Sequence, residues 1–284
     1  MSRVKTSATQ PQIVGIVVLH NEDVFVERAI RNVVDFCDRI HVFDHLSNDK
    51  TPEIIRSLAR EFDHIELKRS RNAAHAQRLL ERYLGTPAWV FAVDGDELYD
   101  PAGLAVLRGD LLAGAHADVF RVKAHVLNCD ELDVEKATAS GFMSPPSRPI
   151  TKLFNFESVT SWTGCQDKLE GGNPVFRPGF DWESLRNLAE TTEWDSDPLR
   201  LLHVCFLRRS SRDHDDGSRG RKNIAETQTH RRGISGSIYR LLRRPKPAPE
   251  LLEAARKSGN WKREKLTRGP RVTVDARPFL GSLE

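Results

Sequence analysis

Three carboxylates lie within four positions in the stretch Asp94-Gly95-Asp96-Glu97. A single glycine separates the two aspartates and lets the backbone turn between them. Carboxylate oxygens are the ligands that hard divalent cations such as Mg2+ and Mn2+ prefer, and such a cation can in turn hold a diphosphate. The alternative interpretation is an ordinary acidic turn after a strand. An EF-hand calcium loop is excluded, because its third ligand position and following glycine are missing.

The apolar run before these carboxylates, residues 88–93 (AWVFAV), is too short for an amphipathic helix and predicts a buried strand. Open α/β sheets bind ligands in the crevice at the carboxyl ends of such strands. The sequence therefore predicts a ligand site where this strand ends.

Three earlier strands are predicted at residues 12–19 (QIVGIVVL), 39–43 (RIHVF) and 64–68 (HIELK). Helical patterns follow them at 26–34, 53–62 and 73–83. Strands that alternate with helices through short connections favour an α/β fold with a parallel, doubly wound sheet. Polar residues come after these strands, and we expect them to converge on the crevice near Asp94 and Asp96: Asn21, Glu22, Asp44 and Arg71.

The pattern beyond Pro101 predicts a mixed second half. A helix is expected at 104–112, strands at 118–127, 152–156, 161–169 and 201–207, and loops at 130–149 and 171–200. His203 lies inside the last apolar run, where a satisfied core histidine is the alternative to a ligand. A polar loop is predicted at 213–220, and a basic, helical extension is predicted to follow it.

Composition and missing motifs exclude several classes of protein. Neither G-x-G-x-x-G nor G-x-x-x-x-G-K-[ST] follows the first strand, which disfavours a dinucleotide oxidoreductase and a P-loop NTPase. No apolar segment is long enough to span a bilayer, and residues 1–10 lack the apolar core of a signal peptide. The four cysteines form no C-x-x-C pair, which favours a cytoplasmic chain with reduced thiols and argues against structural zinc.

The net charge of +3 hides an asymmetry within the 284 residues. Residues 1–207 contain 23 Lys and Arg against 31 Asp and Glu, whereas residues 208–284 contain 20 against 9. The basic tail could therefore meet phosphates or anionic lipid, or lie against the acidic body, and a solvated basic face is the alternative. The tail lacks aromatic residues interleaved with its basic residues beyond Tyr239 and Trp261, so no nucleic-acid partner is expected.

The order of these motifs resembles the family 2 glycosyltransferases of GT-A fold, in particular a bacterial subgroup with a D-A-D-E type metal motif. The matching residues are Asn21-Glu22, the segment 44–51 (DHLSNDKT), Gln77-Arg78, Trp89-Val90, Asp94-Gly95-Asp96-Glu97, His203, Arg209-Ser210 and Lys222. The match covers residues 12–110 well and 150–225 loosely. Lys50 replaces the glycine of a D-G-T turn, and His45-Leu46 replace small polar residues, which leaves the donor open.

The resemblance implies a division of the chain into four parts. Residues 11–115 would form the nucleotide-sugar-binding half of a GT-A domain, and residues 116–212 its acceptor-side half. Residues 1–10 would be a flexible arm, and residues 213–284 a lid loop with the basic extension.

The resemblance also implies which residues hold the nucleotide-sugar. Leu19, His20, Glu22 and Asp44 would contact the base and ribose, with Asp44 accepting a hydrogen bond from the imide N–H of uracil or thymine. A UDP- or dTDP-type donor is therefore favoured. Two arginines would approach the base or diphosphate, with a surface ion pair as the alternative for each: Arg71 and Arg78.

A second group of residues would act on the diphosphate. By resemblance, Asp96 and His203 would bind Mn2+ or Mg2+, while Asp94 and Gly95 would line the nucleotide-sugar site. Glu97 would fix the loop or contact the sugar. Three basic residues would neutralise charge on the departing nucleotide: Arg208, Arg209 and Lys222.

An inverting transfer also needs a carboxylate that takes the proton from the acceptor hydroxyl. The family often has G-x-V-H-E-x-L where this chain has residues 164–169 (GCQDKL), which places Asp167 at the acidic position. Gln166 departs from the family's histidine. Glu170 and Asp181 are alternatives for the base, and a salt-bridged loop aspartate is the non-catalytic interpretation of Asp167.

The predicted function is a metal-dependent, inverting glycosyltransferase that acts on a hydroxyl of a small molecule or glycan. Contact of the basic tail with a membrane or lipid-linked acceptor, and a homodimer contact through residues 230–284, are further hypotheses. A nucleotidyltransferase on a related sheet is an alternative, although the segment after the first strand is acidic (HNED) rather than basic. A non-catalytic anion-binding protein is the other.

Overall fold

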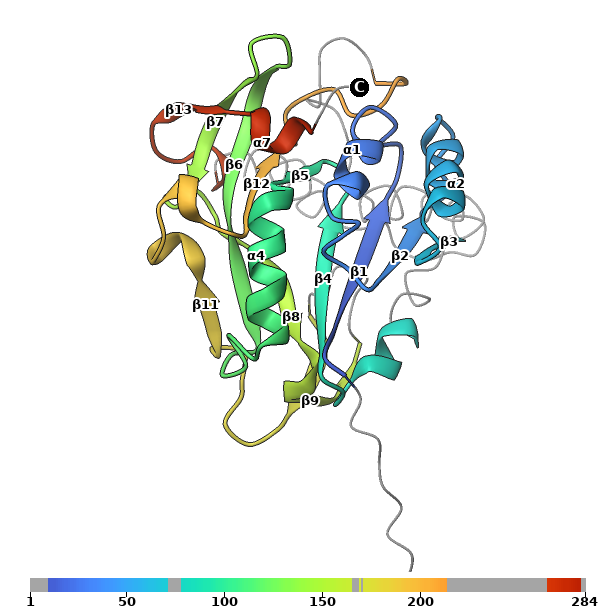
Figure 1. The fold of residues 1–284 in the computed structure, drawn as a ribbon, viewed down its shortest axis with the longest axis vertical. Helices are drawn as coiled ribbons and strands as arrows, with labels where there is room; N and C mark the ends of the chain where they lie inside the picture. The colour runs from blue at the N-terminus through green and yellow to red at the C-terminus, as the bar shows by residue number, and fades with distance from the viewer. Residues whose placement is uncertain (1–9, 71–77, 165–168, 170, 214–264, 282–284) are drawn as a thin grey trace, which may run out of the picture.

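The computed structural model describes residues 10–70, 78–164, 169, 171–213 and 265–281. Within this part of the chain, the main sheet has the strand order β13-β7-β6-β8-β4-β1-β2-β3 (Figure 1). Its strands are β1 (Gln12–Leu19), β2 (Arg39–Asp44), β3 (Ile65–Arg69), β4 (Ala88–Asp94), β6 (Arg121–Asp133), β7 (Thr138–Ser144), β8 (Ile150–Asn155) and β13 (Arg271–Asp275). The longer helices are α1 (Val26–Arg31), α2 (Thr51–Glu61) and α4 (Pro101–Leu112).

The first four strands form the parallel half of the sheet, as predicted. β1 pairs in parallel with β2 on one side and with β4 on the other, and β2 pairs in parallel with β3. The chain therefore builds outward from β1 in one direction and then returns to its other side. This reversal is the topological switch point of a doubly wound sheet.

Apolar residues fill both faces of β1, which explains its unbroken apolar run. Ile13 and Val17 pack under α1, α2 and α4, whereas Val14 and Ile16 pack in a second cluster with Trp162. A strand covered on both faces has no polar side to show to water. Figure 1 shows the three helices on the viewer's side of the sheet, and none of the described helices is long and apolar enough to cross a membrane.

The second half of the sheet is mixed, also as predicted. β8 runs antiparallel to both β4 and β6. Two short strands attach to β6 in parallel: β11 (Leu185–Asn187) and β12 (Arg200–His203). β12 also pairs antiparallel with β5 (Glu97–Tyr99), while β9 (Val159–Thr163) and β10 (Asn173–Phe176) form a separate hairpin.

Two expectations for this half were wrong. Residues 130–149 were expected to be a loop, yet β6 continues to Asp133 and β7 returns antiparallel beside it. Serine and acidic residues in this hairpin hid the pattern. Gly141 explains the close approach of the two strands, because a Cβ at this position would overlap the backbone of Asn128.

The basic extension was expected to be helical, but its described end contains a strand as well as a short helix. Residues 271–275 form β13, which pairs antiparallel with β7 at the edge of the sheet. The short helix α7 (Arg277–Leu280) follows and buries Phe279 and Leu280 in a third apolar cluster with β6 and β12 residues. The end of the chain is therefore an integral part of the described fold. The rest of the extension, like residues 1–9, lies outside the described residues.

Candidate active site

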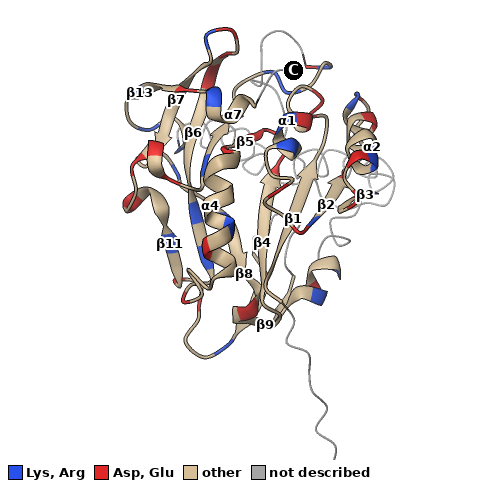
Figure 2. Cartoon of the chain, in the orientation of Figure 1, with Lys and Arg blue, Asp and Glu red and all other residues tan. Residues whose placement is uncertain are grey.

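The parallel strands bring most of the predicted site residues to one edge of the sheet. Leu19 at the end of β1 is in register with Asp44 at the end of β2, and Val18 is in register with Asp94 at the end of β4. The arrowheads of β1 and β4 point to the same edge in Figure 1, and acidic segments lie near β5 in Figure 2. The expected convergence is confirmed for these residues.

The acidic turn between β4 and β5 packs directly against the segment after β1. A Cβ added to Gly95 would lie 2.9 Å from Cγ of Glu22, so only glycine allows this approach. Asp96 is 3% exposed, and its carbonyl oxygen accepts a hydrogen bond from the Val204 N–H over 2.9 Å. The turn is thus fixed from two sides, by the end of β1 and by the residue after β12.

Glu97 holds this turn in place through contacts in the protein interior. Its Oε1 lies 2.5 Å from Nζ of Lys152 on β8, and its Oε2 accepts hydrogen bonds from Tyr99 Oη (2.9 Å) and the Asp94 N–H (3.1 Å). Burial raises the pKa of Glu97 to about 7, while Lys152 opposes the rise. Lys152 also lies 3.8 Å from Oδ2 of Asp94. Of the two roles considered for Glu97, the structure supports fixing of the loop.

His203 ends β12 and faces the turn. Its Nε2 lies 3.7 Å from Oδ2 of Asp96, and β12 pairs it with Glu97 on β5 and Asn128 on β6. Burial lowers the pKa of His203, and the nearby carboxylate of Asp96 opposes this shift. The structure therefore brings the two predicted metal ligands together from positions more than a hundred residues apart.

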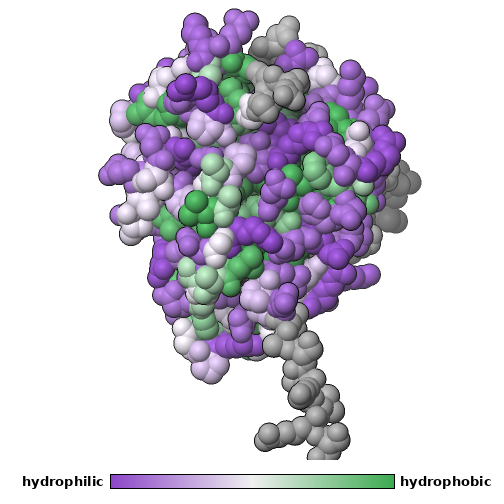
Figure 3. All heavy atoms as spheres, in the orientation of Figure 1, coloured by the Kyte–Doolittle hydropathy of each residue, from purple (hydrophilic) through white to green (hydrophobic). Residues whose placement is uncertain are grey.

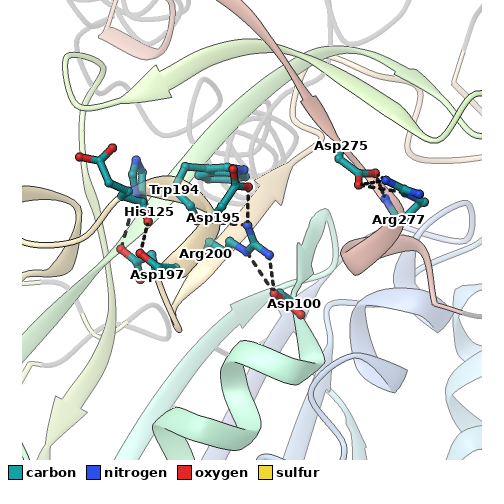
Figure 4. A network of polar contacts seen from close by, with 10 residues as sticks. Asp100, His125, Trp194, Asp195, Asp197, Arg200, Asp275 and Arg277 are labelled. Carbon is teal, nitrogen blue, oxygen red and sulfur yellow. Dashed lines mark hydrogen bonds and ion pairs between the residues drawn. The ribbon is translucent and has the colours of Figure 1, made fainter.

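A network of ion pairs fixes the start of the same strand (Figure 4). Arg200 donates to Oδ2 of Asp100 from Nε (3.0 Å) and Nη2 (2.9 Å), and to Oδ1 of Asp195 from Nη1 (3.0 Å). Asp100 also caps α4 by accepting a hydrogen bond from the Ala102 N–H. The guanidinium carbon of Arg200 lies 5.4 Å from the Phe279 ring centre, so α7 helps to position β12.

Arg209 supplies the cation nearest to Asp96. Its Nη1 forms an ion pair with Oδ2 of Asp96 and lies 3.7 Å from Oε1 of Glu22. Burial lowers the pKa of the guanidinium, but these two carboxylates together hold it above its usual range. The backbone of Arg209 is also fixed, because its carbonyl accepts a hydrogen bond from the Val24 N–H.

The segment around Arg209 is held against the loops at the strand ends. Ser210 is fully buried and donates from Oγ to Oδ2 of Asp49 over 2.6 Å. The Ser211 N–H donates to Oδ1 of Asp23 over 2.6 Å. Burial raises the pKa of Asp23, but hydrogen bonds from Ser211 and the Lys50 backbone hold it below its usual range. The predicted R-S motif is thus part of the site.

Asp44 lies at the site's edge but already binds its own loop. The residue is 0% exposed; Oδ1 accepts from the Ser47 N–H (2.8 Å), and Oδ2 accepts from Nε of Arg69 (2.6 Å). Arg69 also donates to the Ser47 carbonyl oxygen. This arrangement shapes the loop where a base is expected, and direct contact of Asp44 with a base stays a prediction.

The remaining predicted residues differ in what the structure shows of them. His20 follows β1, and its Nδ1 lies 2.9 Å from the His45 carbonyl oxygen. Arg78 is exposed, and its contact with a donor stays a prediction. Several candidates lie outside the described residues: Arg71, Asp167, Glu170 and Lys222.

Asp181, an alternative for the base, lies far from the acidic turn. Its Oδ1 accepts three hydrogen bonds within its own turn, from Glu183 and Ser184. Ser184 in turn bonds the start of β6. Because β6 runs parallel to β4 through their shared antiparallel neighbour β8, its start lies at the sheet edge opposite Asp96. Asp181 is therefore not a candidate for the base.

The chemistry of the site fits a divalent cation in part. No group of three acidic, histidine or cysteine side chains suited to a metal ion occurs among the described residues. Asp96 and His203 nevertheless present an oxygen and a nitrogen 3.7 Å apart, as two ligands of one ion can. The remaining positions would fall to diphosphate oxygens and water, as is usual for Mg2+.

The net charge of this cluster of side chains also favours a divalent cation. Four carboxylates face one another here against two cations, which leaves a formal charge of −2 when all four are ionised: Glu22, Asp94, Asp96 and Glu97 against Lys152 and Arg209. Buried charge is costly unless it is balanced. One divalent cation would balance this cluster.

Sequence reasoning missed three residues of this region: Lys152, Asn128 and Arg69. Lys152 is 3% exposed and is the first residue of the predicted strand 152–156, and a charged side chain that is buried in this way needs a buried partner. No local pattern marks the other two, because their roles depend on which strands become neighbours.

Comparison with protein-family models gives no match, and comparison with curated proteins also gives none. Among solved structures, the chain is similar to a mannosyltransferase, PcManGT, from Pyrobaculum calidifontis in complex with GDP-Man and Mn2+. The identity is 24%, the TM-score 0.33, and the match covers 41% of this chain and 36% of that chain.

A second similar structure is glucosyl-3-phosphoglycerate synthase from Mycobacterium tuberculosis with phosphoglyceric acid, at 23% identity and TM-score 0.31, covering 41% of this chain and 44% of that chain. A third is 4-diphosphocytidyl-2C-methyl-D-erythritol synthase from Anaerococcus prevotii, at 12% identity and TM-score 0.30, covering 52% and 71%. The chain spans less than half the length of the first two proteins.

Proposed function

We propose that this protein is a metal-dependent, inverting glycosyltransferase that moves a sugar from a nucleotide-diphosphate-sugar to an acceptor hydroxyl. The observation that carries the proposal is the meeting of Asp96, His203 and Arg209 at the switch point between β1 and β4. Anionic carboxylates, a neutral imidazole and a guanidinium together suit a diphosphate bound through a cation. A turn that is acidic by chance would not need buried partners from three segments far apart in the sequence, those of Glu22, Lys152 and Arg209.

The donor would lie along the carboxyl ends of β1, β2 and β4. The loop that Asp44 and Arg69 shape would receive the base, and a UDP- or dTDP-type donor is preferred. The turn at Asp94 and Gly95 would receive the ribose and diphosphate. The acceptor, a small molecule or glycan, would approach from the second half of the sheet.

Asp96 and His203 would hold Mn2+ or Mg2+, which when bound supplies positive charge to the leaving diphosphate. Arg209 would add a guanidinium next to that charge. Its position is fixed before the reaction, so no rearrangement is needed to bring it there. Lys152 and Glu97 keep the turn in place. Asp167 is the proposed base, which takes the proton from the acceptor hydroxyl.

The proposal is tested by calorimetric binding of UDP-, dTDP- and GDP-sugars to the full chain, with and without Mn2+ or Mg2+. We expect metal-dependent binding of one nucleotide class and slow release of the nucleoside diphosphate. Asp96→Asn should lower turnover by on the order of a hundredfold. Asp63→Asn is the matched control, because the Asp63 side chain is fully exposed.

Two results would overturn the proposal. The first is absence of metal-dependent binding for every nucleotide-sugar. The second is release of pyrophosphate from a nucleoside triphosphate, included in the same panel, which would instead support a nucleotidyltransferase. An anion-binding protein without activity would bind its ligand equally well after Asp96→Asn.

A further inference from the structure

Both ring nitrogens of His203 face a defined partner. Nδ1 lies 3.0 Å from Oδ1 of Asn128, and Nε2 lies 3.7 Å from Oδ2 of Asp96. β12 runs parallel to β6 with His203 in register with Asn128, so the two side chains leave neighbouring strands at the same level. The imidazole is thus placed between an amide and a carboxylate.

The amide of Asn128 can meet His203 in only one orientation. Its Nδ2 donates a hydrogen bond to the Phe142 carbonyl oxygen on β7 over 3.3 Å, which leaves Oδ1 on the side of His203. Asn128 is 0% exposed, so water does not compete for its side-chain amide. The hydrogen bond to Phe142 on the neighbouring strand holds the amide in this orientation.

The orientation of the amide decides which nitrogen of His203 carries the hydrogen. An amide oxygen only accepts hydrogen bonds, so Nδ1 of the neutral ring must be the donor. The lone pair of the ring then lies on Nε2, the atom that faces Asp96. A lone pair opposite a carboxylate oxygen is unfavourable unless a positive centre lies beside them, and in this structure the guanidinium of Arg209 is ion-paired with that oxygen. The Nε2 lone pair and the Asp96 carboxylate are suited to hold a metal cation between them when Arg209 releases this oxygen.

We infer that Asn128 is a positioning residue that fixes His203 as the Nδ1–H tautomer and so keeps Nε2 available as a metal ligand beside Asp96. The inference rests on the proposed function, because it concerns the cation that the donor diphosphate would require. Hydrogen-bonded partners behind a ligating histidine set its tautomer and orientation in this way. Asn128 would touch neither the cation nor the substrate.

A consequence for the choice of cation follows. Mg2+ strongly prefers oxygen ligands, whereas first-row transition ions accept an imidazole nitrogen more readily. A nitrogen ligand presented by Asn128 should therefore favour Mn2+ over Mg2+. Loss of this ligand should weaken Mn2+ binding more than Mg2+ binding, while simple loss of structure would weaken both alike.

The tautomer is measured directly on the metal-free full chain. Protein labelled with 15N at histidine is studied by NMR at pH 8, where a neutral imidazole is expected. The His203 signals are assigned by their loss in His203→Gln. We expect the hydrogen on Nδ1 in the wild type, and a hydrogen on Nε2 instead would overturn the inference without any Asn128 variant.

Two variants then test the role of Asn128. Asn128→Leu removes the acceptor at similar volume, and the nearest remaining partner of the ring is Asp96, so the hydrogen should move to Nε2. Asn128→Asp keeps an acceptor and should retain the Nδ1–H tautomer. An unchanged tautomer in a folded Asn128→Leu protein, verified by circular dichroism, would overturn the inference.

Metal affinity provides the second readout. Titration with Mn2+, followed by electron paramagnetic resonance of the free ion, should show binding weakened roughly 10- to 100-fold in Asn128→Leu. Asn128→Asp should stay within about threefold of the wild type. If the wild type binds a nucleotide-sugar with Mn2+ and Asn128→Leu binds Mn2+ equally well, the inference fails while the proposed function stands. If no nucleotide-sugar binds although the variants behave as expected, only the proposed function fails.

Discussion

Lys152 and Glu97 form a buried ion pair beneath the acidic turn, with Nζ 2.5 Å from Oε1 and side chains only 3% and 1% exposed. The pair connects β8 to β5. Because Glu97 also binds the Asp94 N–H and Tyr99 Oη, it fixes the turn through three partners. The turn that carries Asp94 and Asp96 is therefore held by a buried, charged support.

Lys152→Met should destabilise the protein by about 3–5 kcal/mol at pH 8, because it leaves Glu97 buried without its counter-charge. Burial raises the pKa of Glu97 to about 7, well above its unfolded value of 4.5, and Lys152 limits the rise. A raised pKa gives stability that is complete below pH 4.5 and is lost as pH increases through 7. Without Lys152 this loss grows, so urea unfolding should show a larger effect at pH 8 than at pH 5.

The control for this prediction is the double variant Lys152→Met/Glu97→Gln. A neutral amide needs no counter-charge, so the double variant should recover much of the lost free energy of unfolding at pH 8. Equal destabilisation by Lys152→Met at both pH values would contradict the assignment of a buried charge pair.

Arg209→Met should change two affinities in opposite directions. In the protein without donor, the guanidinium occupies Oδ2 of Asp96, so its removal should strengthen Mn2+ binding by about tenfold or more. The same change should weaken nucleotide-sugar binding in the presence of Mn2+ by roughly 10- to 100-fold, since a charge-assisted contact to the diphosphate is lost. Both are measured by calorimetry.

Arg212→Met is the matched control, because it removes the same charge from an exposed side chain three positions away. Neither affinity should change by more than about twofold, since exposed charges interact weakly through water. A parallel fall of both affinities in Arg209→Met would contradict competition between Arg209 and the cation.

The sequence predicts which residues belong to the site better than it predicts their positions relative to one another. Apolar runs that end in polar residues predicted the strands, and parallel pairing of β1, β2 and β4 then placed Glu22, Asp44 and Asp94 at one edge. This inference succeeds because strand direction alone decides which edge a strand end occupies. His203 and Arg209 were reached by resemblance, and the structure brings both to Asp96.

Other parts of the site could not be predicted from local pattern. Lys152 meets Glu97 only because β8 inserts antiparallel between β4 and β6, and no short-range signal specifies that neighbour. The same holds for Asn128, whose partner is set by the parallel register of β6 and β12. Small and polar residues in β7 concealed a strand whose stability comes from its neighbours on both sides.

His41 should make stability depend on pH between about 4 and 6.5. The residue is 1% exposed on β2, with Nε2 3.1 Å from both Tyr83 Oη and Arg82 Nη2. Burial lowers the pKa of His41 to about 4, with Glu66 opposing and Arg82 assisting. The unfolded imidazole binds a proton below about pH 6.5 while the folded one stays neutral, so stability falls as pH decreases to 4.

The expected loss from this group is up to about 3 kcal/mol, from a shift of about 2.5 pH units. Urea unfolding of the wild type and His41→Gln across pH 4–7 measures it, since glutamine keeps a polar partner but does not titrate. The wild type should lose more free energy of unfolding than the variant over this range. Parallel curves for the two proteins would rule out a buried neutral His41.

Gly95→Ala tests the close approach of the acidic turn to the end of β1. An added methyl group would lie 2.9 Å from Cγ and 3.0 Å from Cβ of Glu22. Both atoms are near the Glu22 backbone, so rotation at the end of the side chain cannot relieve the overlap. We expect a loss of about 1–3 kcal/mol in the free energy of unfolding and weaker nucleotide-sugar binding. Gly109→Ala in α4 is the control: nothing lies within 4 Å of its added methyl group, so it should stabilise the helix by about 0.5–1 kcal/mol and leave binding unchanged. If the two alanine variants behave alike in unfolding and binding, the tight contact between Gly95 and Glu22 does not shape the site.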